Sequence, residues 1–268
     1  MHSEPIYTPE NVRAPAYHLR YTWSGWPSEG AFPPAPADHF WTDVDAAWES
    51  DGIRRLITNW TPTLIQFTFS VRPTVSPVFF AGRVKGRLQH ALRRSNLDVN
   101  FSRKLAVRTI GDNHRAEVEA YIRNQVKNEE LADPRFKEFL ESLVFVDPDV
   151  DLSQPSESLS GRYWYNLHLV LVMGGRYRIG DQQRLLLLRE RCPQIAVKKG
   201  HGLSRLAILP DHLHMALRGN IEHSPEQIAL AYMNNLAFSM GQQAIWEFGY
   251  YVGSFSEYDM GAVRVRAL

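Results

Sequence analysis

The feature that most constrains this sequence is an internal repeat at a fixed offset of 148 residues. Tyr17 and Leu19 in YHLRYTW match Tyr165 and Leu167 in YNLHLVLV. The same offset also joins Pro62 with Pro210, Ser76 with Ser224, Pro77 with Pro225 and Leu88 with Leu236. The identities are few, but strand, turn and helix signals keep one order in both copies. This pattern indicates a duplicated structural unit, so each later inference concerns two copies.

Each copy has the periodicity of a strand, a helix with a loop, a strand that runs into a Ser-Pro turn, a second helix and a short strand. In the first copy these elements are expected at residues 17–23, 40–56, 63–71, 78–94 and 104–109. In the second copy they are expected at residues 164–173, 181–191, 203–217, 225–242 and 249–255. The order predicts an α+β protein built from two β-α-β-β-α-β units.

The repeat divides the chain into three segments. We expect a first unit at residues 1–146, a linker at 147–160 and a second unit at 161–268. The linker contains DPDVDLSQPSES, which is acidic and rich in Ser and Pro, a composition typical of linkers.

A further helix is expected after the first unit's last strand and not after the second's. In GDNHRAEVEAYIRNQVKNEEL, Asp112 or Asn113 can cap a helix, and strong helix formers follow. Alignment of Val107 with Val252 places Tyr121 opposite Arg266, two residues from the end of the sequence. We therefore expect the second unit to lack a counterpart of this helix.

Composition restricts the class of protein. A length of 268 residues suits two compact units, and a net charge of +1 gives no overall basic character, so any nucleic-acid surface must be local. A single cysteine, Cys192, excludes an intramolecular disulfide framework and fits a reducing compartment. The absence of a signal-like segment and of long apolar runs favours a soluble cytoplasmic protein with no membrane partner.

Two histidines stand close together in PDHLH. On a strand, residues i and i+2 point the same way, so His212 and His214 project from one face and can share a metal ion. Such a pair alone is weak evidence, because half-buried histidines without a ligand are common.

The expected extra helix carries Tyr121 and Gln125, which are four residues apart and therefore lie on one helix face. Beside them runs the apolar stripe of Val118, Ile122 and Val126, which has to pack inward. Taken alone, a tyrosine beside an apolar stripe is more often the edge of a core than a nucleophile.

Together, PDHLH, YHL or YNL at the first strand, GYYVGS and YIRNQ resemble the single-tyrosine HUH transposases, which include the TnpA transposases of insertion sequences and the REP-associated tyrosine transposases. The resemblance covers most of the chain, in pieces spread over both units. It implies ferredoxin-like units and a nucleophilic Tyr121 that attacks single-stranded DNA. It also implies a divalent metal ion, Mg or Mn, held by His212, His214 and Gln125, with Asp211 supporting the first histidine.

The chain departs from that family in an instructive way. TnpA is a homodimer in which the tyrosine helix of one protomer docks on the histidine strand of the other. Here His212 and His214 fall opposite Leu64 and Gln66 in the first unit, which therefore lacks the histidines. The first unit keeps the tyrosine helix and the second unit keeps the histidines, so the two units complement each other. We therefore expect a fused intramolecular pseudodimer with one composite active site. The chain would act as a monomer, and a higher assembly on DNA stays open.

Basic residues are unevenly distributed between the units. The resemblance favours a phosphate-contacting surface for single-stranded or hairpin DNA, although a solvated helix face is an equal alternative for the second helix of the first unit. The candidate DNA-binding residues are Arg83, Lys85, Arg87, Arg93, Arg94, Arg103, Lys104, Arg108, Lys198, Lys199 and Arg205.

Two functions follow from the sequence. The first is metal-dependent nicking and strand transfer of single-stranded DNA through a 5′-phosphotyrosine intermediate, as in transposition. The alternative is a catalytically inactive binder of structured single-stranded DNA or RNA.

Overall fold

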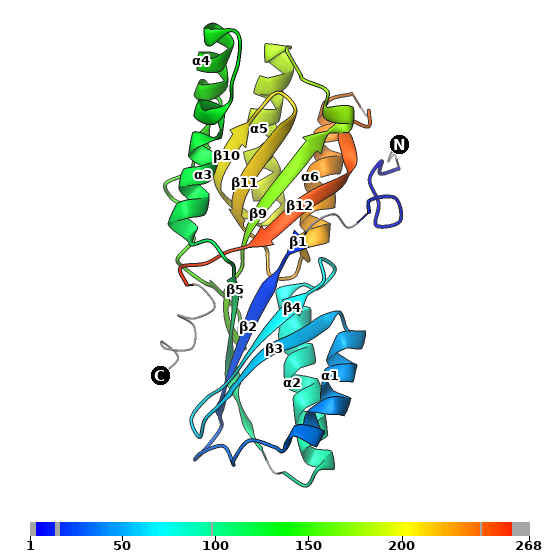
Figure 1. Cartoon of the computed structure of the whole chain (residues 1–268), viewed down its shortest axis with the longest axis vertical. Helices are drawn as coiled ribbons and strands as arrows, with labels where there is room; N and C mark the ends of the chain where they lie inside the picture. The colour runs from blue at the N-terminus through cyan, green and yellow to red at the C-terminus, as the bar shows by residue number, and fades with distance from the viewer. Residues whose placement is uncertain (1–3, 14–16, 98, 242, 259–268) are drawn as a thin grey trace.

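The computed structural model describes residues 4–13, 17–97, 99–241 and 243–258. Figure 1 shows an elongated molecule in which the first unit forms the lower half and the second unit the upper half. The helix α3 (Arg115–Asn128), which follows the first unit in sequence, lies beside the upper half. The second helix after this unit, α4 (Pro134–Ser142), continues along the same side.

The first unit is an antiparallel sheet with two helices on one face. Its strands lie in the order β3-β4-β2-β5, with α1 and α2 packed against each other and against the sheet. The bounds are β2 (Arg20–Pro27), α1 (Trp41–Ser50), β3 (Ile53–Trp60), β4 (Ile65–Val71), α2 (Pro77–Arg94) and β5 (Phe101–Ile110).

The second unit repeats this architecture. Its strands lie in the order β10-β11-β9-β12, which is the first unit's order element for element. The bounds are β9 (Asn166–Met173), α5 (Gln182–Lys199), β10 (Gly202–Ile208), β11 (His212–Arg218), α6 (Pro225–Ser239) and β12 (Trp246–Ser254). The chain is therefore an α+β protein of two ferredoxin-like units in tandem, as the sequence predicted.

The main differences from the sequence prediction concern four elements. The helix expected at 40–56 ends at Ser50, because Gly52 turns the chain in the left-handed region (φ 81°) and the β-branched residues after it form β3. The helix expected to end at Arg191 passes through Pro193 and ends at Lys199, where Gly200 caps it in the left-handed region. The segment 203–217 is a hairpin of two strands, and α6 ends at Ser239, so residue 242, the expected end, lies outside the described residues.

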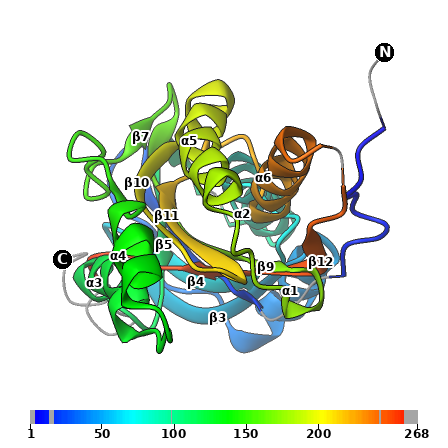
Figure 2. The same ribbon diagram turned by 90° about the horizontal axis from the view of Figure 1, so that it is seen from above.

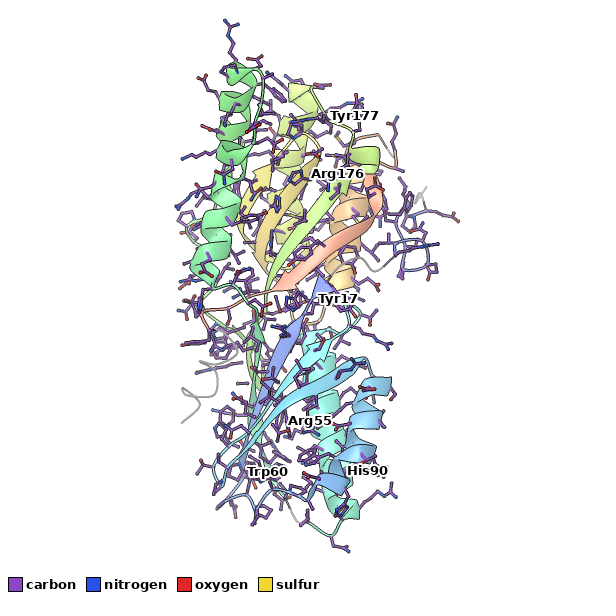
Figure 3. All side chains as sticks on the ribbon, in the orientation of Figure 1. Tyr17, Arg55, Trp60, His90, Arg176 and Tyr177 are labelled. Atoms are coloured by element: carbon purple, nitrogen blue, oxygen red, sulfur yellow. The ribbon has the colours of Figure 1, made fainter. Side chains whose placement is uncertain are left out.

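The two units exchange strands at their junction. The short strand β1 (Tyr17–His18), which leads into β2, pairs in parallel with β12 of the second unit. The strand β8 (Gly161–Trp164), which leads into β9, pairs in parallel with β5 of the first unit. Tyr17 lies at this junction in Figure 3. Each sheet therefore holds a strand of the other unit, which fixes the two units against each other.

The registers of these exchanged strands define the repeat. Tyr17 pairs with Val252, and Tyr163 pairs with Val107. The two pairs are equivalent at an offset of 146 for the first strands (163 − 17) and 145 for the last strands (252 − 107). The offset of 148 assigned to the first strand from sequence is therefore too large by two, which leaves the face of each side chain unchanged because side chains alternate along a strand.

Hydroxyl groups satisfy the backbone where the strands cross. The amide of Arg20 donates to Ser254 Oγ at 2.9 Å, and the amide of Asn166 donates to Thr109 Oγ1 at 3.0 Å. The two bonds are equivalent in the repeat, because Arg20 corresponds to Asn166 at the offset of 146 and Thr109 corresponds to Ser254 at the offset of 145. Because both hydroxyl-bearing residues are buried, each hydroxyl replaces a backbone partner that the crossing removes.

The remaining short strands extend both sheets. The strand β6 (Phe145–Val146) pairs with β10, and β7 (Ser156–Glu157) pairs with β8. The segment expected as a linker is packed, since Leu152 is buried and its carbonyl accepts from the side-chain amide of Asn166 at 2.8 Å.

The first residue after β5, Gly111, sets the path of the chain toward the second unit. A Cβ atom at Gly111 would overlap the carbonyl oxygen of Ser254, so only glycine allows this close approach to β12. We predict that Gly111→Ala lowers the free energy of unfolding by about 1–3 kcal/mol through overpacking.

Gly86→Ala, in the exposed middle of α2 with no atom near the new Cβ, serves as the matched control and should raise the stability by up to about 1 kcal/mol. Urea unfolding of both variants measures the difference. Equal effects of the two substitutions would contradict this account of Gly111.

Candidate functional site

The helix α3 packs on the face of the second unit's sheet that α5 and α6 leave open, as Figure 2 shows from above. Its buried Val118 and Ile122 contact a small cluster on β10 and β11 that includes Ala207 and Ala216. The small alanine side chains let the helix approach the sheet closely. The first unit's tyrosine helix therefore lies on the second unit's histidine strand.

Polar contacts fix the rotation of α3 on this sheet. Glu119 accepts from the Ser204 hydroxyl at 3.2 Å and pairs with Arg205 at 3.7 Å, which ties the helix to β10. At the start of α3, Arg115 pairs with Asp151 at 3.3 Å and also with Glu257. Arg205, a candidate DNA-binding residue, is thus engaged in holding the helix.

This docking brings Tyr121 to the histidines. Its ring centroid lies 5.6 Å from that of His214 and 5.9 Å from that of His168, with edge-to-face geometry in both cases. Tyr121 is 51% exposed, so the residue can be reached from solvent. Tyr251 on β12 forms the next wall, with its ring 5.7 Å from that of His168.

The two histidines of PDHLH lie side by side on β11, with ring centroids 4.9 Å apart. The His212 Nδ1 atom lies 2.7 Å from the Asp211 carboxylate, which Arg176 also contacts at 3.3 Å. Figure 3 places Arg176 at the outer end of the second unit. A neutral His212 that donates from Nδ1 to Asp211 leaves its Nε2 lone pair free.

A third histidine, His168 on β9, belongs to the same site and escaped the sequence analysis. Its Nε2 atom lies 3.0 Å from Nδ1 of His214. The Nε2 atom of His214 is buried and has no hydrogen-bond partner within the described part of the chain. The isolated position of His168 in an apolar strand gave no signal, because only the strand register shows that it neighbours His214.

Both inner histidines are neutral near pH 7. Burial lowers the pKa of His214 to about 2, with His168 and His212 as further causes, and burial lowers the pKa of His168 to about 4. Although burial alone would raise the pKa of Asp211, its contacts with His212 and Arg176 hold that pKa below the usual value. The site therefore combines neutral imidazoles with an ionised carboxylate.

Gln125 lies one turn beyond Tyr121 on α3, as its spacing predicted. Its side-chain amide donates to the carbonyl of Tyr121 at 3.4 Å, and among the described residues it has no hydrogen bond to a histidine.

The donor set fits a divalent cation in part. No group of three His, Cys, Asp or Glu side chains in the described residues is arranged to hold an ion. His212 and His214 nevertheless each engage Nδ1 within the protein, which leaves the Nε2 atom of both for a ligand. Among the described residues, Nε2 of His214 is buried and has no hydrogen-bond partner. Histidines that bind a metal ion are typically oriented by a hydrogen bond from the ring nitrogen that does not bind the ion. An amide oxygen can serve as a further ligand of a divalent cation.

Several candidate DNA-binding residues on α2 are engaged within the protein. Arg83 and Arg87 pair with Asp51 at 3.8 and 3.1 Å, and Lys85 donates to the Ser102 carbonyl at 2.8 Å. The helix α2 covers the face of its sheet opposite to the polar face, so its cations lie away from Tyr121. Arg93 and Arg94 at the end of α2, Arg103 and Lys104 on β5, and Lys198 on α5 are exposed, and Lys199 is half-buried.

None of the helices in the described residues is long and apolar enough to cross a membrane.

Comparisons with known proteins leave the family open. Neither a family model nor a curated protein sequence matches this chain. Among solved structures, a transposase candidate of Deinococcus radiodurans R1 is similar over 38% of this chain and 85% of its own, at 18% identity and a TM-score of 0.30. The regulatory subunit of aspartate kinase from Thermus thermophilus is similar over 81% of this chain and 92% of its own, at 10% identity and a TM-score of 0.19. At these scores neither likeness supports an argument about activity.

The buried histidines should make the fold sensitive to mild acid. His201, outside the site, has a pKa lowered to about 4, first by burial and then by His223 and Lys199. An unfolded histidine titrates near 6.5, so below that pH the unfolded chain binds protons that the folded chain does not, and stability falls as pH decreases toward 4. We predict a falling free energy of unfolding between pH 6.5 and 5.

The variant His201→Asn isolates one histidine, because an asparagine oxygen can still accept from the amide of Asn220, which donates to His201 Nδ1 at 2.9 Å. Its slope of stability against pH should be smaller by up to about 1.4 kcal/mol per pH unit. Denaturant titrations at several pH values measure the slope, and an unchanged slope would refute the assignment.

Proposed function

We propose that the protein cuts and rejoins single-stranded DNA through a covalent bond between Tyr121 and a 5′-phosphate. The observation that carries the proposal is the packing of the Tyr121 ring against His214 and His168, which two different units supply. The same site also holds His212 beside His214 and the ionised Asp211 beside His212, which a tyrosine at the edge of an ordinary core would not require.

The residues of the chain have distinct tasks in this reaction. Tyr121 is half exposed, and its hydroxyl attacks the scissile phosphate, which forms a phosphotyrosine and releases a 3′-hydroxyl. Attack by a 3′-hydroxyl on the phosphotyrosine reverses the step, because the ester bond conserves the energy of the cut bond. The proton of the tyrosine passes to the departing oxygen, so the reaction is a transesterification and consumes no water.

A divalent cation, Mg or Mn, would be held by Nε2 of His212, Nε2 of His214 and the side-chain oxygen of Gln125. When bound, it supplies positive charge to the non-bridging oxygens of the phosphate. Asp211 and His168 orient the two imidazoles through their Nδ1 atoms, as the distances of 2.7 and 3.0 Å support. Tyr251 stays protonated, because burial raises the pKa of its hydroxyl.

The deciding experiment incubates the protein with labelled single-stranded and hairpin oligonucleotides and Mn or Mg, and then separates the products in SDS. We expect a covalent adduct that requires the cation and is lost in Tyr121→Phe and in His212→Ala. Tyr251→Phe is the matched control, since it removes a hydroxyl from the same site and should leave the adduct intact.

A protein that binds these oligonucleotides tightly and forms no adduct with any of them would instead be a binder of structured single strands. An adduct that persists in Tyr121→Phe and disappears in Tyr251→Phe would assign the nucleophile to β12 and overturn the role of Tyr121.

The hydrogen bond between His168 and His214 gives a separate prediction. When His168 accepts from Nδ1–H of His214, the Nε2 lone pair of His214 is available to a cation. We expect His168→Phe, which keeps a ring but removes the acceptor, to weaken Mn binding by roughly 10- to 100-fold.

His168→Gln is the matched control, because its amide oxygen can accept in place of Nε2 and should restore most of the affinity. Electron paramagnetic resonance of free Mn measures binding without any catalytic step. Equal affinity in both variants would show that His168 only packs against its neighbour.

A further inference from the structure

The first unit has an open cavity on the sheet face that corresponds to the histidine site. The cavity has a volume of about 740 Å³ and lies on the polar face of β2, β4 and β5, away from α1 and α2. Gln66 and Leu64, the counterparts of His214 and His212, line it. In the described residues no helix covers this face as α3 covers the other sheet.

A stacked arginine dominates the wall of this cavity. The Arg108 guanidinium lies 3.9 Å from the ring centroid of Trp164 and 4.9 Å from that of Tyr258. The Trp164 ring is itself fixed, since its Nε1 donates to the Ser153 carbonyl at 2.8 Å. This stacking holds the planar guanidinium in one orientation.

The N–H edges of Arg108 are available to a ligand. Within the described residues, the Arg108 side chain has no ion pair and no hydrogen bond, although it is partly buried. Burial lowers its pKa, with Glu257 among the weaker opposing influences, yet an arginine stays charged at neutral pH. The described residues give this partly buried cation ring faces but no hydrogen-bond acceptor for its side chain, so a ligand that supplies acceptors would stabilise it.

The other walls supply the remaining parts of a nucleotide site. Trp26 is 39% exposed at the cavity and offers a ring face for stacking. On the floor, the buried Gln66 amide donates to Ser24 at 3.1 Å and leaves its oxygen to accept from a base. Lys104 and Arg162 add positive charge. Glu157 pairs with Arg162 at 3.1 Å and neutralises part of this charge.

We propose that this cavity binds a nucleotide of single-stranded DNA, with the base between the aromatic and amide groups and a phosphate near the cations. An aromatic ring, a rigid guanidinium donor and flanking lysine charge match a base and its phosphate, whereas a small inorganic anion would leave most of the volume empty. The inference does not need the catalytic step, because a protein that only binds DNA would use the cavity in the same way.

The test uses the full chain and a fluorescein-labelled oligothymidylate of eight nucleotides, with affinity measured by anisotropy. Arg108→Met should weaken binding about 10- to 100-fold. Arg103→Met is the matched control, because it removes one charge from the same strand without touching the cavity, and it should weaken binding only a few-fold.

A second variant guards against misfolding of Arg108→Met. Trp26→Ala changes an exposed ring and should weaken binding about 10-fold while the thermal unfolding midpoint stays unchanged. Equal loss in Arg103→Met and Arg108→Met, or no loss in Arg108→Met and Trp26→Ala, would overturn the proposal.

The outcome is separable from that of the proposed function. Tyr121→Phe should bind the oligonucleotide as tightly as the unaltered protein. Loss of affinity in Arg108→Met without any adduct in the unaltered protein would support the cavity and reject catalysis. Adduct formation with full affinity in Arg108→Met would support catalysis and reject the cavity.

Discussion

Two buried hydroxyl groups, those of Thr109 and Ser254, hold the place where each unit sends its first strand into the other unit's sheet. A chain that leaves one sheet and enters another exposes backbone groups that no ladder satisfies, and burial makes such groups costly. The hydroxyls accept from the amides of Asn166 and Arg20, so the crossing can lie inside the molecule. The two units are thus parts of one body, and the composite site depends on that geometry.

The position of Tyr121 follows from this crossing. Only four residues separate the end of β5 at Ile110 from the start of α3 at Arg115, a link that spans at most about 14 Å. Because β5 ends beside β12 at the junction, α3 has to begin at the edge of the second unit's sheet. Its apolar stripe then finds Ala207 and Ala216, which are small enough to accept a helix, and Tyr121 falls over His214.

The sequence predicted the duplication and the fold class, because these depend on patterns that recur along the chain. The meeting of Tyr121 with His214 was expected only from the resemblance to the single-tyrosine transposases. It missed β3, since the turn at Gly52 lies within a segment whose apolar spacing also suits a helix. It also missed His168 and the partners of Arg83, Arg87 and Arg205, because such contacts join residues far apart in sequence and depend on strand register and side-chain reach. Trp23 is buried in the core, whereas Trp26 lines the cavity, a distinction that periodicity alone could not make.

The asymmetry between the two sheets has a physical logic. A face that carries α3 excludes solvent and gives histidines the burial that keeps them neutral, whereas the face without a covering helix must keep polar side chains such as Gln66 and Thr22. The same two segments line both places: β5 carries Arg108 and runs on into α3, and β8 carries Trp164 and runs on into His168 of β9. A strand of DNA held at Arg108 would therefore be fixed relative to Tyr121 by rigid sheet elements, with no hinge between them. In the proposed reaction one tyrosine would hold one DNA end at a time, so a non-covalent site at Arg108 on the same body would give the other part of the strand a defined place.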